Sequence, residues 1–369
     1  MTIAISGTTG ITLAGQFDSA SSMGFKNRII NGAMVIDQRN AGASVTPATG
    51  AYTLDRWAVE MSQASKFSVQ QNAGSVTPPT GFKNYLGATS LSAYTVGASE
   101  YFVIGQAIEG YNVADLAFGT ADAATVILSF WVRSSLTGTF GGTLLNSGAS
   151  RNYVFSYTIN SANTWEQKTV TIIGDTSGTW LTTNGAGFYV RFSIGAGSSV
   201  TGTAGSWSGT TYRSVTGQTS VVGTNGATFY ITGVQLEKGT QATAFDYRDY
   251  GNELSLCQRY LPAFTAQSGT VGPLPGSGTA LGTGSVLIFN HPVPARVPST
   301  GVGVSAVTHF NFSNNDGNSP STAVSFAAGS PDATQLSITV ASSRGATTTP
   351  GWFYANNTAA RLYITGCEL

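Results

Sequence analysis

The sequence predicts an all-β protein, and three observations support this fold class. Short runs of β-branched and aromatic residues, such as 126–133, alternate with turns rich in Gly, Ser, Thr and Asn. Glycine accounts for 46 of the 369 residues, which suits a chain with many turns. The length exceeds the roughly 250–300 residues that one hydrophobic core usually supports, so we expect more than one domain.

The chain divides into four parts. Residues 1–25 form a lead segment that is too small to bury its own apolar residues. The alternation of Ile3, Ile5, Ile11, Leu13 and Phe17 favours order through pairing with other chains over disorder. The other three predicted parts are a large jelly-roll β-sandwich at 26–248, a short helical linker at 249–262 and a C-terminal β-sandwich at 263–369.

The strands of the large domain are expected at the most regular alternating runs, 126–133, 152–159, 168–173, 187–194 and 228–237. Their spacing of about 10–20 residues is typical of a sandwich or jelly roll. The run 228–237 carries bulky residues on both faces, so we expect it to be covered on both sides. The linker helix should begin at Asn252, which can cap free amides, and should end before Pro262.

Composition argues against several functions. Lys+Arg and Asp+Glu are 17 each, so no global positive field would attract nucleic acid. The apolar runs are shorter than the roughly 18–20 residues that a membrane helix needs. No secretory signal is visible at the N-terminus, so we expect synthesis in a cytoplasm without export. Cys257 and Cys367 indicate two buried thiols, with a single bridge left open.

A series of motifs is the most specific feature of the chain. It opens with NRIINGAMVIDQRN at 27–40 and YTLDRW at 52–57. Further motifs follow in order: IEGYN at 108–112, LSFWVR at 128–133, ANTWE at 162–166, GDTSGTW at 174–180, ITGVQLEKG at 231–239, ATAFDYR at 242–248 and CQRY at 257–260. Over about residues 27–261 they resemble the β-sandwich modules in tail fibres and related virion appendages of tailed bacteriophages. The middle block is similar, more distantly, to jelly-roll carbohydrate-binding modules.

This resemblance implies a homotrimeric virion protein of the tail or another surface appendage. The lead segment would attach it to a tail or capsid protein, and the C-terminal domain would face the receptor, a host cell-surface glycan. A capsid or tail decoration protein without receptor binding is the alternative. Independently, a charged content of 9% leaves strand edges poorly protected by repulsion, which favours association of some kind.

Two clusters combine aromatic and polar residues in a way that suits a sugar, because a ring can stack on a pyranose while polar groups donate hydrogen bonds. The first is Trp207, Tyr212 and Arg213, for which covering the sandwich edge is an equal alternative. The second is Trp352 and Tyr354, where Phe353 lies between them and at least one ring should point outward.

The sequence favours binding over catalysis. Neither His291 nor His309 lies near a nucleophile motif, and no spacing selects the two carboxylates that a glycan-degrading tailspike would need. No cofactor motif and no metal-ligand spacing is present, and 314–318 is interpreted as a turn. We expect Asp37, Arg39, Asp55 and Arg56 to form ion pairs that satisfy buried polar groups.

Overall fold

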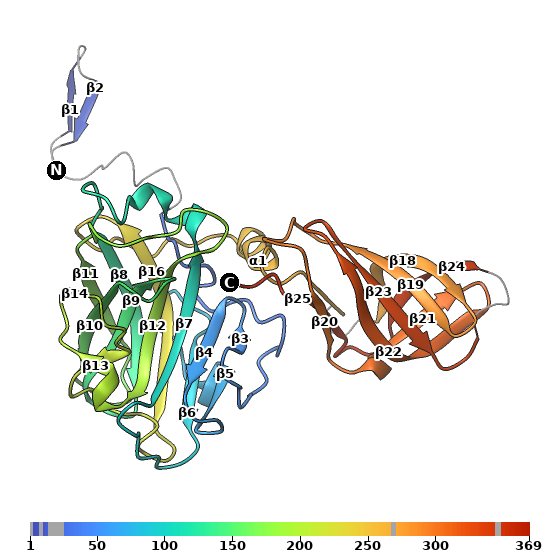
Figure 1. Cartoon of the computed structure of the whole chain (residues 1–369), viewed down its shortest axis with the longest axis horizontal. Coiled ribbons are helices and arrows are strands. Elements are labelled where there is room, and N and C mark those ends of the chain that lie inside the picture. The colour runs from blue at the N-terminus through green and yellow to red at the C-terminus, as the bar shows by residue number, and fades with distance from the viewer. Residues whose placement is uncertain (1–2, 7–9, 14–25, 267–270, 344–347) are drawn as a thin grey trace.

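The structure is a computed structural model that describes residues 3–6, 10–13, 26–266, 271–343 and 348–369 (Figure 1). The all-β class is confirmed, with a β-sandwich followed by the helix α1 (Tyr250–Gln258) and a second β domain. No helix in these ranges is long and apolar enough to cross a membrane. Short 3-10 turns supplement the strands: η1 (Ala73–Ser75), η2 (Gly110–Asn112), η3 (Ala114–Leu116), η4 (Ser198–Val200) and η5 (Val307–His309).

Two facing sheets form the jelly roll. The larger has the strand order β14 (Trp207–Ser208), β10 (Asn152–Ile159), β9 (Gly138–Asn146), β12 (Ala186–Ala196), β7 (Tyr101–Glu109), β4 (Trp57–Met61) and β3 (Tyr52–Leu54). The smaller has the order β11 (Glu166–Ile172), β8 (Val126–Ser134), β16 (Thr228–Lys238), β6 (Leu86–Ser90) and β5 (Phe67–Gln71). The alternating runs predicted from the sequence therefore supply strands to both sheets.

Aromatic side chains fill the space between the two sheets. Phe130 of β8 meets Phe192 of β12 edge to face, with ring centroids 5.0 Å apart. Trp57 lies 6.5 Å from Phe192 in the same core and is fully buried. Each such ring removes a large apolar area from water, so these contacts hold the sheets together.

One excursion of the chain covers part of the outer face of the larger sheet. Between β12 and β16 it forms the short strands β13 (Thr201–Gly202) and β15 (Ser214–Val215), which pair in parallel. A Cβ added at Gly141 of β9 would meet Ser214 and Val215, so this excursion lies directly on β9. The excursion leaves a cavity over the outward residues of β4, β7 and the adjoining part of β12.

The motif at 27–40 forms a buried strap against β16. The backbone nitrogen of Arg28 donates to the Leu236 carbonyl, and the amide of Val234 donates to the Gly32 carbonyl. Tyr230 contacts Tyr85 and Trp165 further along β16. The expectation that this strand is covered on both faces is confirmed, and segments of the same chain provide the cover.

The linker helix begins earlier than the sequence suggested. Asp249, and not Asn252, is the capping residue, because its side chain accepts a hydrogen bond from the Asn252 backbone nitrogen at 3.0 Å. An aspartate also places negative charge at the positive end of the helix. Cys257 and Tyr260 pack with Ile30 and Ile36 of the strap, so the helix docks on the jelly roll. Cys257 and Cys367 are both free and buried.

The C-terminal part refines the prediction of a β-sandwich. Its main sheet closes into a barrel in the order β18 (Gly272–Leu281), β19 (Gly284–Asn290), β23 (Ala333–Val340), β22 (Gly317–Gly329), β21 (Phe310–Asn314) and β24 (Thr349–Ala355). A three-stranded sheet of β17 (Ala263–Thr265), β25 (Arg361–Thr365) and β20 (Gly301–Val304) adjoins it. Pairing of β24 with β18 closes the barrel, and Phe353 stacks on Phe310 inside it at 5.0 Å.

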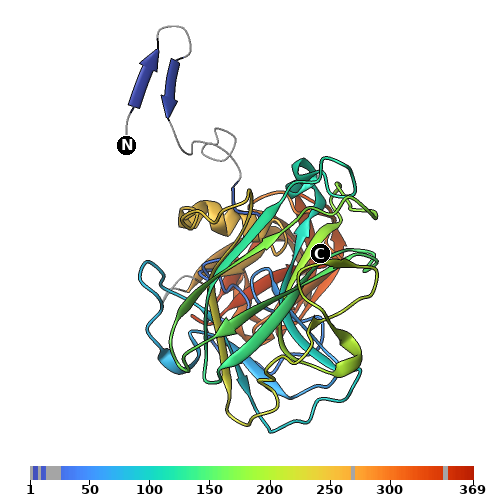
Figure 2. The same cartoon turned by 90° about the vertical axis from the view of Figure 1, so that its left-hand side faces the viewer.

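In the lead segment, β1 (Ile3–Ser6) and β2 (Gly10–Leu13) pair antiparallel, with Ile3 opposite Leu13 and Ile5 opposite Ile11. Figures 1 and 2 show this hairpin standing apart from the jelly roll. Phe17 lies outside the described residues. Pairing of the lead segment with other chains stays a prediction.

Buried charges join the two domains, although not through the ion pairs expected from the sequence. Arg56 pairs with Glu368 at 2.6 Å, and Arg39 pairs with the other oxygen of the same carboxylate at 3.0 Å. Asp37 accepts hydrogen bonds from the backbone nitrogens of Asn40 and Gly42, and Asp55 accepts from Gln38. The expected ion pairs are therefore wrong. Backbone amides of a turn bind Asp37, Gln38 binds Asp55, and both arginines pair with Glu368, which is distant in sequence.

We predict that Gly32→Ala destabilises the protein by about 2 kcal/mol or more. A Cβ at this position would lie 2.2 Å from the Val234 carbonyl oxygen, so the strap would have to leave β16. Urea unfolding measures the effect. Gly272→Ala is the matched control, because no atom lies within 4 Å of its added Cβ. Equal stability of the two variants would contradict the role given to the strap.

We also predict that Asp55 makes stability fall as pH rises. Burial raises the pKa of Asp55 to about 6, from an ordinary value of 3.8. The folded state therefore favours the protonated form, and stability is lost between about pH 4 and pH 6, by on the order of 3 kcal/mol. Denaturant unfolding of wild type and Asp55→Asn across this range isolates the contribution. If the free energies of unfolding of the two proteins differed by the same amount at every pH, Asp55 would not contribute to the pH dependence.

Candidate functional site

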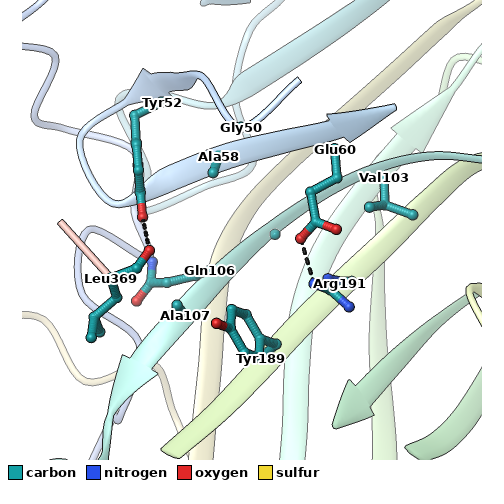
Figure 3. Close-up of a pocket in the computed structure, with 11 residues that line it drawn as sticks. Gly50, Tyr52, Ala58, Glu60, Val103, Gln106, Ala107, Tyr189, Arg191 and Leu369 are labelled. Carbon is teal, nitrogen blue, oxygen red and sulfur yellow. Dashed lines mark hydrogen bonds and ion pairs between the residues drawn. The ribbon is translucent and has the colours of Figure 1, made fainter. Parts of the chain in front are cut away.

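The open part of the larger sheet is hollowed because three of its outward residues are small. Ala58 of β4 is the register partner of Gly105 of β7, and Gly105 is the partner of Arg191 of β12. Ala107 lies two residues further along β7 and pairs with Tyr189. Larger side chains surround this floor and enclose a cavity of about 360 Å³ (Figure 3).

Aromatic and charged side chains form the walls of this cavity. Figure 3 shows the phenol groups of Tyr52 and Tyr189 on one side and Glu60 with Arg191 on the other. Leu369 also lines the cavity, and its carbonyl oxygen accepts a hydrogen bond from the Tyr52 hydroxyl at 2.6 Å. Burial raises the pKa of Tyr52 to about 12, so the phenol stays neutral at physiological pH.

Arg191 is the most buried charged group of the cavity, with 8% of its surface exposed. Its Nη2 donates to Glu60 Oε1 at 2.5 Å, and its guanidinium carbon lies 4.9 Å from the centroid of the Tyr189 ring. Its Nε and Nη1 are buried and have no hydrogen-bond partner among the described residues. Burial lowers the pKa of Arg191, because a buried cation loses hydration.

A second arginine lies beside this pair at the rim of the cavity. Arg213 stacks its guanidinium over the Tyr101 ring at 4.3 Å, and its Nη1 lies 3.8 Å from Glu60 Oε2. Arg213 comes from the excursion that covers β9, and its backbone nitrogen donates to the Val200 carbonyl. One carboxylate thus faces two guanidinium groups.

The structure separates the other members of the first predicted cluster from this cavity. Trp207 packs against Trp180 at 5.4 Å and Tyr153 at 5.2 Å, and its indole nitrogen donates to the Ile173 carbonyl. The ring of Tyr212 lies against Gly202, where an added Cβ would come within 2.5 Å of it. Both rings therefore hold the covering excursion in place. Of the three residues, Arg213 lies beside the cavity.

The second predicted cluster lies on the barrel. Trp352 and Tyr354 alternate with the buried Phe353 on β24, as the sequence suggested, and Trp352 is 43% exposed. Trp352 is the register partner of Ser277 on β18, and Tyr354 is the partner of Asn311 on β21. The two rings therefore belong to a different surface from the jelly-roll cavity, and a binding role for them stays a prediction.

Sequence reasoning missed Tyr52, Glu60, Tyr189 and Arg191. A usable signal was present for two of them, because Tyr189 and Arg191 alternate with the core residues Phe188, Val190 and Phe192 in an expected strand. Alternation places them on the outer face of the sheet. It does not reveal which strands lie beside them, so it could not predict the hollow.

The described residues offer no metal site and place one histidine in a structural role. They hold no group of three or more His, Cys, Asp or Glu side chains that could bind a metal ion. Both ring nitrogens of His291 are engaged, at 2.7 Å from the Pro331 carbonyl and 2.8 Å from Thr334 Oγ1. Within 314–318, residues 315 and 316 form the turn between β21 and β22, and the flanking residues pair across the two strands.

Comparisons with known proteins find fold neighbours among solved structures. No family model and no curated protein matches the sequence. A putative sugar-binding protein of Bacteroides thetaiotaomicron is 11% identical with a TM-score of 0.34, covering 58% of this chain and 100% of that one. A family 11 carbohydrate-binding module of Clostridium thermocellum, solved with a mixed-linked tetrasaccharide, is 12% identical with a TM-score of 0.29, covering 53% and 96%.

The enzymatically active domain of tailspike protein 4 from bacteriophage CBA120 is a further neighbour, with 11% identity and a TM-score of 0.29. The match covers 53% of this chain and 21% of the tailspike chain, so it spans about a fifth of that protein. At these identities and TM-scores the neighbours carry no argument about the function of this chain. The ligand must be argued from the cavity itself.

Proposed function

We propose that this chain is a bacteriophage virion fibre protein that attaches the particle to its host by binding a surface glycan in the cavity of the jelly roll. The observation that carries the proposal is the hollow between Tyr52, Tyr189, Glu60 and Arg191. Its volume of about 360 Å³ lies within the range of small-molecule sites, roughly 300–1,000 Å³. The virion context is supported by the motif series at 27–261.

The chemistry of the walls suits a sugar. Tyrosine rings offer apolar faces on which the C–H groups of a pyranose can pack, and the phenol hydroxyls can exchange hydrogen bonds with its hydroxyl groups. Glu60 and Arg191 add an acceptor and donors on the opposite wall. The floor of Ala58, Gly105 and Ala107 lets the ligand approach the sheet closely.

Binding without cleavage is part of the proposal. Hydrolysis of a glycosidic bond normally uses two carboxyl groups that flank it. Among the residues that line this cavity, Glu60 supplies the carboxylate side chain, and Arg191 holds that carboxylate in an ion pair. Host polysaccharide incubated with the protein should therefore yield no new reducing ends. Their appearance would replace attachment by depolymerisation.

Association into a homotrimer is proposed on the resemblance, together with the open edges of the jelly roll. Strands β3 and β14 end the larger sheet, and β5 and β11 end the smaller one. In a chain with 9% charged residues such edges favour pairing or cover. The lead segment would connect the assembly to a tail or capsid protein.

We predict that Tyr189→Ala weakens glycan binding about tenfold, because it removes one stacking face of the cavity. Calorimetry with a glycan first selected on an array measures the change. The matched control is Tyr111→Ala, which removes an exposed phenol of η2 that does not line the cavity. If both variants bound as tightly as the wild type, the cavity would not be the binding site.

We predict that the pure protein sediments as a trimer and that antibody labelling of intact particles locates it on the tail or another external appendage. Sedimentation equilibrium and electron microscopy give the two results. A capsid location, together with failure to bind susceptible cells, would favour the decoration protein. A monomer at micromolar concentration would overturn the trimer.

A further inference from the structure

Two arginines lie next to one glutamate at the jelly-roll cavity. Arg191 lies in the wall and Arg213 at the rim, and both face the single carboxylate of Glu60. The two contacts differ in length. Glu60 accepts a hydrogen bond from Arg191 at 2.5 Å and lies 3.8 Å from Arg213. With Arg213 at the rim, two guanidinium groups therefore lie next to one glutamate carboxylate.

Arg191 also keeps donors that nothing in the described structure uses. Its Nη2 is bonded to Glu60, whereas Nε and Nη1 are buried without a hydrogen-bond partner. A buried guanidinium with unused donors is costly, because the lost hydration is not replaced. An acceptor supplied by a ligand would recover that cost, and a charged acceptor would recover more than a neutral hydroxyl.

The geometry points to a ligand that carries a carboxylate. We propose that the glycan bound in this cavity is acidic, of the uronic or sialic acid class, and that Arg191 receives its carboxylate while Arg213 adds a second positive charge at the rim. This inference rests on the proposed function, because it names the class of glycan for the same site. The planar guanidinium can hold a carboxylate through two parallel N–H···O bonds once Glu60 gives way.

Glu60 then acts as a resident competitor for the ligand. It is 31% exposed on its side chain, so it can turn toward solvent when another carboxylate arrives. The cavity floor at Gly105 supports this arrangement, because an added Cβ there would lie 2.9 Å from the Arg191 side chain. The absence of a side chain at Gly105 lets Arg191 lie flat along the sheet beside the tyrosines.

The direct test compares one polysaccharide in two forms. A glucuronic acid polymer and a polymer of sialic acid are measured by calorimetry, each beside its carboxyl-reduced neutral counterpart and beside a sulfated neutral polymer. At least one acidic polymer should bind about tenfold or more tightly than its reduced form, and added salt should weaken that binding. Equal binding of acidic and reduced forms, or preference for the sulfated polymer, would overturn the carboxylate assignment.

Three variants test whether Arg191 and Glu60 determine the preference for acidic glycans. Arg191→Gln should remove the preference for the acidic form, and Arg191→Lys should restore only part of it because the fork is lost. Glu60→Gln should strengthen acidic binding about tenfold, because it replaces the competing carboxylate with a neutral amide. Arg133→Gln is the charge-matched control, since Arg133 lies on β8 of the other sheet.

The outcomes distinguish the inference from the proposed function. Tyr189-dependent binding of neutral glycans without any gain for acidic ones would retain the glycan site and reject the acidic ligand. Failure to bind any polymer, neutral or acidic, would reject both. If Arg191→Gln does not fold, Glu60→Gln still decides, because weaker acidic binding in that variant would contradict competition between Glu60 and the ligand.

Discussion

The buried guanidinium of Arg56 is the contact on which the arrangement of the two domains depends. It is 1% exposed, stacks over the Tyr260 ring at 3.7 Å, and donates to Glu368 and to the Ala107 carbonyl. A buried cation is tolerated when its charge is paired and its donors are used. Three segments therefore meet at Arg56: the turn after β3, the end of the helical linker and the residues after β25. Ala107 is also part of the cavity floor, so the domain junction and the proposed site share a wall.

The sequence predicted those parts of the fold that local patterning determines. Alternation in 126–133 and 187–194 indicated strands, and the polar end of the linker indicated a helix start within a few residues. Contacts between residues that are far apart in the sequence leave no such local pattern. Glu368 lies 312 positions from Arg56, so the neighbouring Asp55 looked like the natural partner. The all-β class therefore followed from the residues, whereas the closure of the barrel by β18 and β24 did not.

The candidate site was harder to predict for a related reason. Aromatic residues flanked by small polar ones were expected in loops, and Trp207 fits that description in sequence. In the structure its indole packs against Trp180 and Tyr153 and holds a covering segment in place. The hollow arises instead where Ala58, Gly105 and Ala107 come into register on neighbouring strands. A small residue in a strand becomes informative only when its neighbours across the sheet are known.

Closure of the C-terminal barrel has a consequence for how this chain can vary. Every strand of the barrel is hydrogen-bonded to a neighbour on both sides over at least part of its length, so the described part of the barrel leaves few backbone donors and acceptors unpaired. Outward side chains such as Trp352 can then be exchanged while the main-chain ladder stays intact. Changes of these outward side chains therefore create no new strand edges that could aggregate. That risk lies with the end strands of the two sandwich sheets.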